Sequence, residues 1–193
     1  MELNSLGLLA LILPDSIEQP LLALQTALYR ERGVTSAMAL PPLIPVLWTS
    51  RPLPLESVRR IAVTHPSRLR LQERTPVVCG SAVLIAAALR AAEEGGDERR
   101  KEIADAARRE VAAAGVEERE GLFDAPGGVY LAAWEPGRTA DESGAFPALD
   151  HLPEESGALT LTSYLLEFSP SRNWWSSLRY ATAARRRLAA TRR

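Results

Sequence analysis

The stretches ALPPLIPVLW (residues 39–48) and APGGVYLAAW (residues 125–134) decide the fold that we expect for this chain. Each has a proline or glycine pair followed by a run of apolar side chains, a pattern that predicts a short buried strand. The first strand, expected over residues 36–48, contains Pro45, which lacks the amide donor that a regular ladder needs. We therefore expect it to be an edge, bulged or interrupted strand. Two strands of the same character on either side of a long helical pattern predict a domain with two similar halves.

Strand and helix patterns alternate through the rest of the sequence. Apolar runs and two-residue alternation predict further strands, at residues 6–13, 68–73 and 159–168. Apolar residues at three- and four-residue spacing predict helices, at residues 16–32, 55–65 and 97–114. Asp15 or Ser16 can cap the first helix, and Gly33 can end it. Residues 77–92 predict a strand that turns at Gly80 into either a second strand or a short helix. This order of elements predicts an α+β fold.

Composition predicts one globular domain. The chain has 193 residues, of which 46% are hydrophobic and 24% charged, and we expect a single domain over residues 1–170. Glu2 stands where a signal peptide carries positive charge, and the apolar run at residues 6–13 is too short to cross a membrane. These features predict a cytoplasmic protein without a membrane span. The single cysteine, Cys79, has apolar neighbours and is interpreted as a buried structural thiol.

Basic charge is concentrated at the C-terminus. Residues 171–193 hold seven of the 23 basic residues and no acidic residue, so this tail carries +7 and the rest of the chain −8. Its apolar spacing predicts a basic C-terminal helix with Trp174 and Trp175 on the less polar side. Tryptophans beside arginines suit a nucleic-acid backbone or an anionic membrane surface. The interpretation that we prefer needs no partner: the tail packs on its own domain, with its arginines paired to the acidic body.

In element order over residues 5–170, the sequence resembles the two-histidine phosphoesterase superfamily, which includes the RNA 2',3'-cyclic phosphodiesterases once called 2'-5' RNA ligases. The resemblance implies a two-lobed fold of pseudo-symmetric antiparallel sheets with helices on the outer faces. It also implies a motif of the type apolar-His-x-Thr/Ser-apolar on one strand of each half. In that family two imidazoles transfer protons to and from the reacting oxygens, while two hydroxyls hold the phosphate.

For both motifs the sequence keeps the flanking residues but not the histidine or the hydroxyl residue; we call these two stretches, residues 39–48 and 125–134, the motif frames. Leu43 stands where the first histidine would be and Pro45 where its hydroxyl residue would be; in the second frame these positions hold Gly128 and Tyr130. Neither Leu43 nor Gly128 can transfer a proton, and losing such a group costs about 10² to 10⁴-fold in rate for each role. The resemblance therefore implies a catalytically inactive protein whose groove, lined by Tyr130, is kept for binding a nucleotide, an RNA end or a protein. The alternative is a structural interaction module whose groove is filled by Leu43 and Tyr130.

Neither histidine of the chain restores a motif. His65 stands at the end of a predicted helix, directly before Pro66, and not inside an apolar strand. His151 has acidic neighbours but no second histidine or cysteine at metal-ligand spacing. The glycine pairs lack the flanking residues of a phosphate-binding loop. We therefore expect no cofactor and no metal. An active cyclic phosphodiesterase or RNA ligase-like enzyme with a remodelled site, using His65, His151 or a bound metal, is kept as an alternative.

Overall fold

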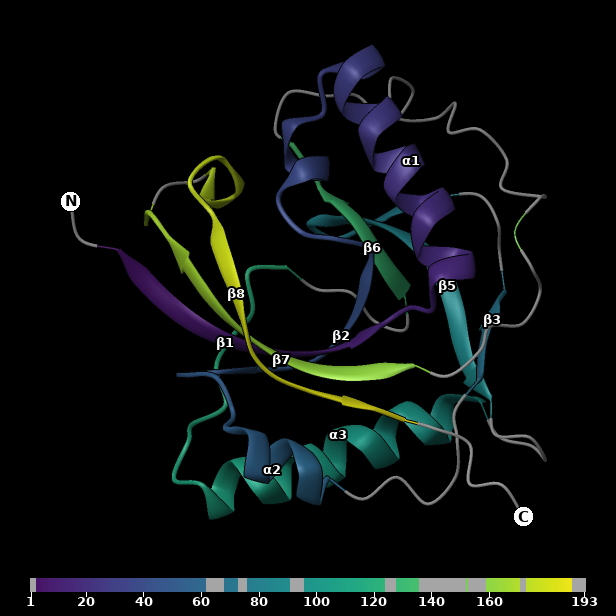
Figure 1. Ribbon diagram of the computed structural model, residues 1–193. Coiled ribbons are helices and arrows are strands. Elements are labelled where there is room, and N and C mark those ends of the chain that lie inside the picture. The colour runs from purple at the N-terminus through teal and green to yellow at the C-terminus, as the bar shows by residue number, and fades with distance from the viewer. Residues whose placement is uncertain are drawn as a thin grey trace.

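An antiparallel sheet with helices packed against it forms the protein (Figure 1). The computed structural model describes residues 3–61, 68–72, 76–90, 96–123, 128–135, 152, 159–170 and 173–188. Its strands are β1 (Asn4–Ile12), β2 (Leu43–Thr49), β3 (Arg68–Leu71), β4 (Val77–Cys79), β5 (Ala82–Arg90), β6 (Gly128–Ala133), β7 (Thr160–Phe168) and β8 (Arg179–Arg187). Its helices are α1 (Asp15–Arg32), α2 (Leu55–Arg60) and α3 (Gly96–Ala113), with 3-10 turns η1 (Thr35–Met38) and η2 (Trp174–Ser176). The expected α+β class is confirmed.

The strands form two groups of four that meet at one place. The order across the sheet is β3-β5-β6-β2-β1-β7-β8, with β4 also paired to β5. β1 pairs along its whole length with β7 and also with β2. β2 and β6 share a single ladder pair, Leu43 with Tyr130. One group therefore contains β2, β1, β7 and β8, the other contains β3 to β6, and their junction is the pair Leu43 and Tyr130.

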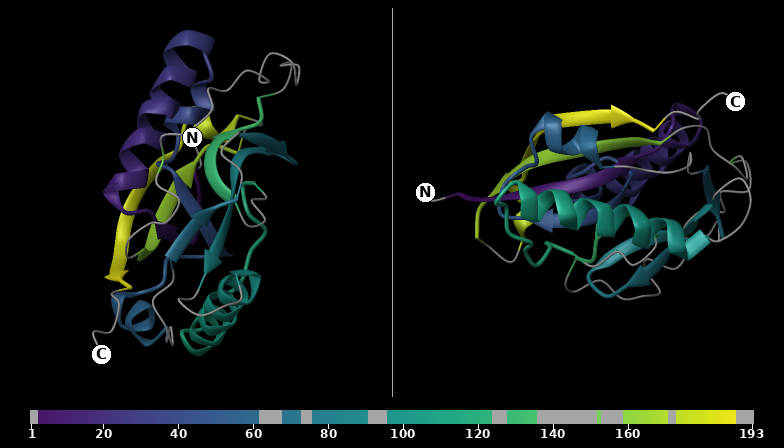
Figure 2. Two further views of the ribbon diagram at one scale, coloured as in Figure 1. Left: turned by 90° about the vertical axis from the view of Figure 1, so that its right-hand side faces the viewer. Right: turned by 90° about the horizontal axis from the view of Figure 1, so that it is seen from below.

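Each face of the sheet belongs to a different apolar cluster. On β1, Leu9 and Leu11 belong to a first cluster, whereas Leu8 and Ala10 belong to a second, as the alternation of side chains along a strand requires. The first cluster also contains apolar residues of α1, α2 and α3, and the second contains none from these helices. In the right-hand view of Figure 2, seen from below, α3 lies in front of the strands of the sheet. The α-helices thus cover one face, which leaves the opposite face to other segments.

Helix α1 begins and ends for identifiable reasons. At its C-terminus Gly33 adopts the left-handed conformation, with φ of 63°, and donates its amide to Tyr29 O over 3.0 Å. At its N-terminus the cap position is held by Pro14, whose carbonyl accepts the amides of Ile17 and Glu18 at 2.9 Å each. No side chain caps this end, so the prediction that Asp15 or Ser16 would do so is wrong. The proline suffices because its carbonyl already satisfies two of the free amides of the first turn.

β2 accommodates Pro45 through a bulge. Leu9 pairs with Leu47 and Ala10 with Pro45, so Val46 is an extra residue opposite the β1 ladder. On its other side β2 pairs with β6 only at Leu43. The missing amide of the proline therefore breaks no further ladder bond, which confirms the expectation of a bulged strand. The strand is shorter than expected, because Thr35–Met38 forms the turn η1 instead.

Two alternatives were open for residues 77–92, and the described part, residues 77–90, forms a hairpin. β4 pairs with the start of β5, and Gly80 makes the turn with φ of 56°, a conformation that glycine adopts without strain. The second half of the segment is therefore a strand and not a helix. Cys79 at the end of β4 is half-buried and packs beside the second cluster, so it is less enclosed than expected.

The predicted basic C-terminal helix over residues 171–193 is wrong for the residues that the structure describes. Trp174–Ser176 forms the short turn η2, and Arg179–Arg187 forms β8, which pairs with β7 along its length. Alanine and arginine favour helix locally, but the free edge of β7 offers a row of backbone partners that a helix would leave unused. Residues 179–187 of the tail thus pack on the domain as a strand of the sheet.

Candidate functional site

The structure brings the four motif positions together on one face of the sheet. Leu43 and Pro45 lie on β2, while Gly128 and Tyr130 lie on β6. Leu43 pairs directly with Tyr130, and both belong to the second cluster, on the face without α-helices. Alternate residues of a strand share a face, so Pro45 and Gly128 point the same way. A Cβ at Gly128 would lie 3.0 Å from the Cβ of Leu84, a member of this cluster.

Three aromatic side chains cover this face; we call Trp48, Phe123 and Trp174 the aromatic cover. Phe123 stacks on Tyr130 with ring centroids 4.4 Å apart. Trp174 stacks on Phe123 at 5.9 Å, and Trp48 meets the Phe123 ring edge-on at 5.2 Å. Leu43 and Tyr130 beneath it are 0% exposed. In this structure Leu43, Gly128 and Tyr130 are therefore buried in the core, whereas Pro45 is half-buried.

The segment after α3 holds the aromatic cover in place. It joins the end of β2 through two backbone bonds, from Ser50 N to Glu117 O at 2.8 Å and from Arg119 N to Trp48 O at 3.0 Å. A Cβ at Gly121 would lie 2.1 Å from the indole nitrogen of Trp48, so the ring packs directly on the glycine backbone. Sequence reasoning missed this segment. Its one local signal is the apolar pair before residue 124, which follows a strongly polar run.

Tyr130, predicted to line a ligand groove, has a core environment. Its hydroxyl donates to Ser36 O at 3.2 Å, and burial raises the pKa of the phenol well above its ordinary value. The phenol therefore stays protonated and its donor is already used. A ligand would have to displace Phe123 to reach it.

A buried polar network ties β6 to α1 and η1. Gln25 of α1 is 2% exposed and donates its amide to Leu40 O at 3.0 Å and Leu131 O at 2.8 Å. Ser36 donates its hydroxyl to Ala133 O at 2.8 Å. These bonds satisfy carbonyls that a regular β2–β6 ladder would have used. The network fixes the position of β6 where the pairing between the two groups of strands is short.

Glu135 directly follows β6 and binds the start of η1. Its carboxylate accepts the amide of Ser36 at 2.7 Å and the hydroxyl of Thr35 at 2.9 Å. A carboxylate at the free amides of a helical turn is a favourable charge-assisted contact. Glu135 therefore has a structural role in this region.

The histidines of the alternative active-site hypothesis, His65 and His151, both lie outside the described residues. Within the described ranges no group of three or more histidine, cysteine, aspartate or glutamate side chains is placed to hold a metal ion. No described helix is long and apolar enough to cross a membrane.

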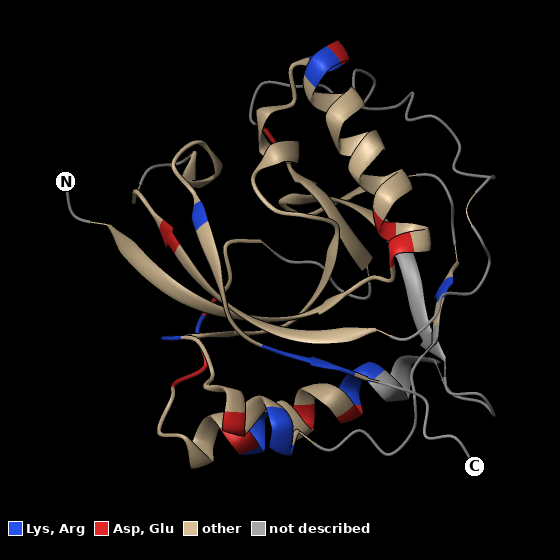
Figure 3. Ribbon diagram, viewed as in Figure 1, with Lys and Arg blue, Asp and Glu red and all other residues tan. Residues whose placement is uncertain are grey.

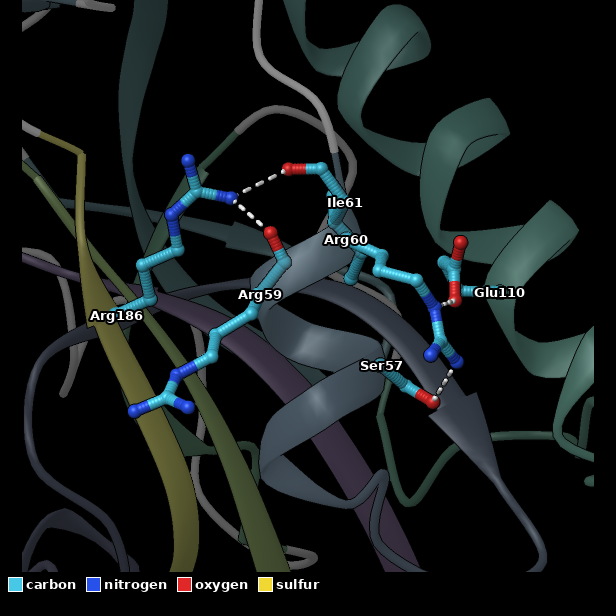
Figure 4. Close-up of polar contacts among 6 residues, drawn as sticks. All are labelled: Ser57, Arg59, Arg60, Ile61, Glu110 and Arg186. Carbon is cyan, nitrogen blue, oxygen red and sulfur yellow. Dashed lines mark hydrogen bonds and ion pairs between the residues drawn. The ribbon is translucent and has the colours of Figure 1, made fainter.

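Within the described part of the chain, the arginines of β8 form no ion pair with the acidic body, which differs from the pairing that the sequence suggested. Arg186 instead donates to Arg59 O and Ile61 O at the C-terminal end of α2 (Figure 4). Beside it Arg60 forms an ion pair with Glu110 of α3 at 2.9 Å. Among the described residues, no ion pair joins Arg179, Arg185, Arg186 or Arg187 to a carboxylate. One arginine of the strand therefore anchors α2 through backbone carbonyls, which the charge pattern alone did not indicate.

Comparison with known proteins gives no family assignment. No protein-family model matches the sequence, and no curated protein matches it in a sequence search.

Proposed function

We propose that the chain is a catalytically inactive protein with a two-histidine phosphoesterase-like fold, whose motif face is filled by its own aromatic side chains and which acts through binding. The observation that carries this proposal is the enclosure of Leu43 and Tyr130 beneath Phe123. Leu43 carries no titratable group, and the Tyr130 phenol is fully buried, with its hydroxyl donating to Ser36 O and its pKa raised by burial.

The strand arrangement supports the proposed family resemblance. Two groups of four antiparallel strands meet at β2 and β6, the two strands that carry the motif frames. The family places one motif on a strand of each half, with the catalytic groups facing each other. All four frame positions share the face without α-helices, which is consistent with helices on the outer side of a two-lobed fold.

The filled face favours the structural alternative at the motif positions themselves. Phe123 and Trp174 are 3% and 8% exposed, so they act as core residues there. Binding by this protein is therefore expected outside the four frame positions. The resemblance implied that Tyr130 contacts a ligand, but as a buried core residue it is not expected to do so.

A hydrolysis assay tests the absence of catalysis. The full chain should not hydrolyse 2',3'-cyclic AMP above the buffer rate, with or without added Mg²⁺ or Zn²⁺, because the general acid and base are absent. His65→Ala and His151→Ala provide the matched variants. Turnover by the wild-type chain that either variant abolishes would overturn the proposal and support the remodelled active site.

A further inference from the structure

Hydroxyl and guanidinium side chains share one face of β7 and β8, on the same side of the sheet as the motif frames. Thr160 pairs with Arg187 and Thr162 with Arg185. Thr162 also pairs with Ala10 of the second cluster, which places these side chains on the face without α-helices. We call these four residues, Thr160, Thr162, Arg185 and Arg187, the β7–β8 polar face. Figure 3 shows the basic end of β8 in blue.

This polar face continues the ladder rows of the motif frames. Leu43 pairs with Ile12, and Ile12 with Thr160. Pro45 pairs with Ala10, which in turn pairs with Thr162. Each hydroxyl is thus two strands away from a motif position in its own row, about 10 Å at the usual strand spacing. Hydroxyls and cations are present on the motif side of the sheet, but displaced from the filled positions.

The polar side chains of this face have no hydrogen-bond or ion-pair partner among the residues that the structure describes. Thr162 is 2% exposed, yet its hydroxyl forms no hydrogen bond with any described residue. Buried hydroxyls are nearly always hydrogen-bonded, so this group calls for a water molecule or a ligand. Arg185 and Arg187 are exposed and form no ion pair within the described ranges. Two free guanidiniums beside such a hydroxyl are the donor set that phosphate oxygens require.

Charged groups of α1 and β8 lie near Tyr164, a residue of β7 that also belongs to the second cluster. Glu18 at the start of α1 lies close enough to Tyr164 to raise the pKa of that phenol, whereas Arg185 lowers the pKa of the same phenol. Burial, and after it the neighbouring Asp15, raise the pKa of Glu18 itself. Among the described residues, two arginines therefore lie on this face, and the Glu18 carboxylate of α1 lies near it.

We propose that the β7–β8 polar face binds a phosphate group, with Arg185 and Arg187 holding its oxygens and Thr162 donating a hydrogen bond. This inference rests on the proposed function in one respect: the phosphate is bound and not cleaved. Thr160, which is half-buried at the end of the strand, supplies a second hydroxyl. Arg185 stands directly across from Thr162 in the β7–β8 ladder, and its side chain is exposed.

Calorimetric titration of the full chain with inorganic phosphate, at constant ionic strength in chloride, tests the site. Arg185→Gln with Arg187→Gln should weaken phosphate binding by at least about 10-fold, because two charge-assisted contacts are lost. Thr162→Val keeps the shape of the side chain and should weaken binding about 3- to 10-fold. Arg179→Gln is the matched control: it removes the same charge from the same strand at a position paired with Glu167, and it should change binding less than twofold.

The source of the phosphate is distinguished by a second titration, with glycerol 3-phosphate. Binding of the ester alone assigns the site to a phosphorylated organic ligand, and equal binding of both assigns it to the free ion. If neither probe binds at concentrations up to about 10 mM, the inference is overturned. It is also overturned if Arg179→Gln weakens binding as much as the Arg185→Gln, Arg187→Gln double variant does. Phosphate binding together with cyclic AMP hydrolysis would overturn the proposed inactivity but leave this site standing.

Discussion

Removing the Phe123 ring tests whether the aromatic cover packs on the motif face as the structure indicates. Phe123 is 3% exposed and contacts three rings, those of Trp48, Tyr130 and Trp174. Truncating a buried phenylalanine to alanine typically costs about 3–5 kcal/mol, from the lost transfer of the ring and from the cavity that remains. Because the ring lies between other large side chains that collapse poorly, we expect about 4 kcal/mol for Phe123→Ala.

Urea unfolding followed by far-ultraviolet circular dichroism measures this loss without relying on the nearby tryptophans. With a slope of about 2 kcal/mol per molar urea, the midpoint should fall by about 2 M. Tyr29→Ala removes a ring that is 47% exposed, and it should cost less than about 1 kcal/mol. A loss for Phe123→Ala no larger than that of Tyr29→Ala would refute the aromatic cover, and with it the argument that the motif positions are enclosed.

Three further changes test other parts of the structure. Gln25→Ala should lower the free energy of unfolding, measured in urea, by about 2–4 kcal/mol, because two buried carbonyls lose their donor. Its control, Gln19→Ala at an exposed position of the same helix, should cost under about 0.5 kcal/mol. Equal costs for the two variants would contradict the buried network. Burial raises the pKa of Tyr164 to about 12, so the folded state favours the protonated phenol. That stabilisation is complete below pH 10 and is lost towards pH 12, at no more than about 1.4 kcal/mol per pH unit. The Tyr164→Phe variant should therefore lose less stability than the wild type between pH 10 and pH 12. Identical stability profiles over this range would contradict the raised pKa of Tyr164. Gly33→Ala should cost about 1 kcal/mol and lower the melting temperature by about 2–4 °C, because φ of 63° is strained for alanine; an unchanged melting temperature would be inconsistent with the left-handed cap.

Local patterns predicted the elements whose residues carry enough information by themselves. The apolar run near the N-terminus became β1, and the spacing over residues 16–32 became α1 with Gly33 at its end. The bulge at Pro45 also followed from a local fact, the missing amide. The absence of proton-transferring groups at Leu43 and Gly128 is likewise a property of the sequence.

Elements that depend on a partner could not be predicted in this way. Residues 179–187 contain helix-favouring alanine and arginine, yet they form β8 because the edge of β7 supplies backbone partners. The same limit applies to Tyr130, whose environment depends on Phe123, a residue from a segment with no clear local signal.

The sequence by itself determined the α+β class, most of the helices and strands, and the loss of the catalytic groups of the family that it resembles. The tertiary structure decided that Leu43, Gly128 and Tyr130 are buried and that β8 places Arg185 beside Thr162. The physical reason is that hydrophobic periodicity acts within one element, whereas strand pairing and burial depend on residues far apart in the chain. The candidate phosphate site belongs to the second kind, because its hydroxyls and its guanidiniums come from different strands.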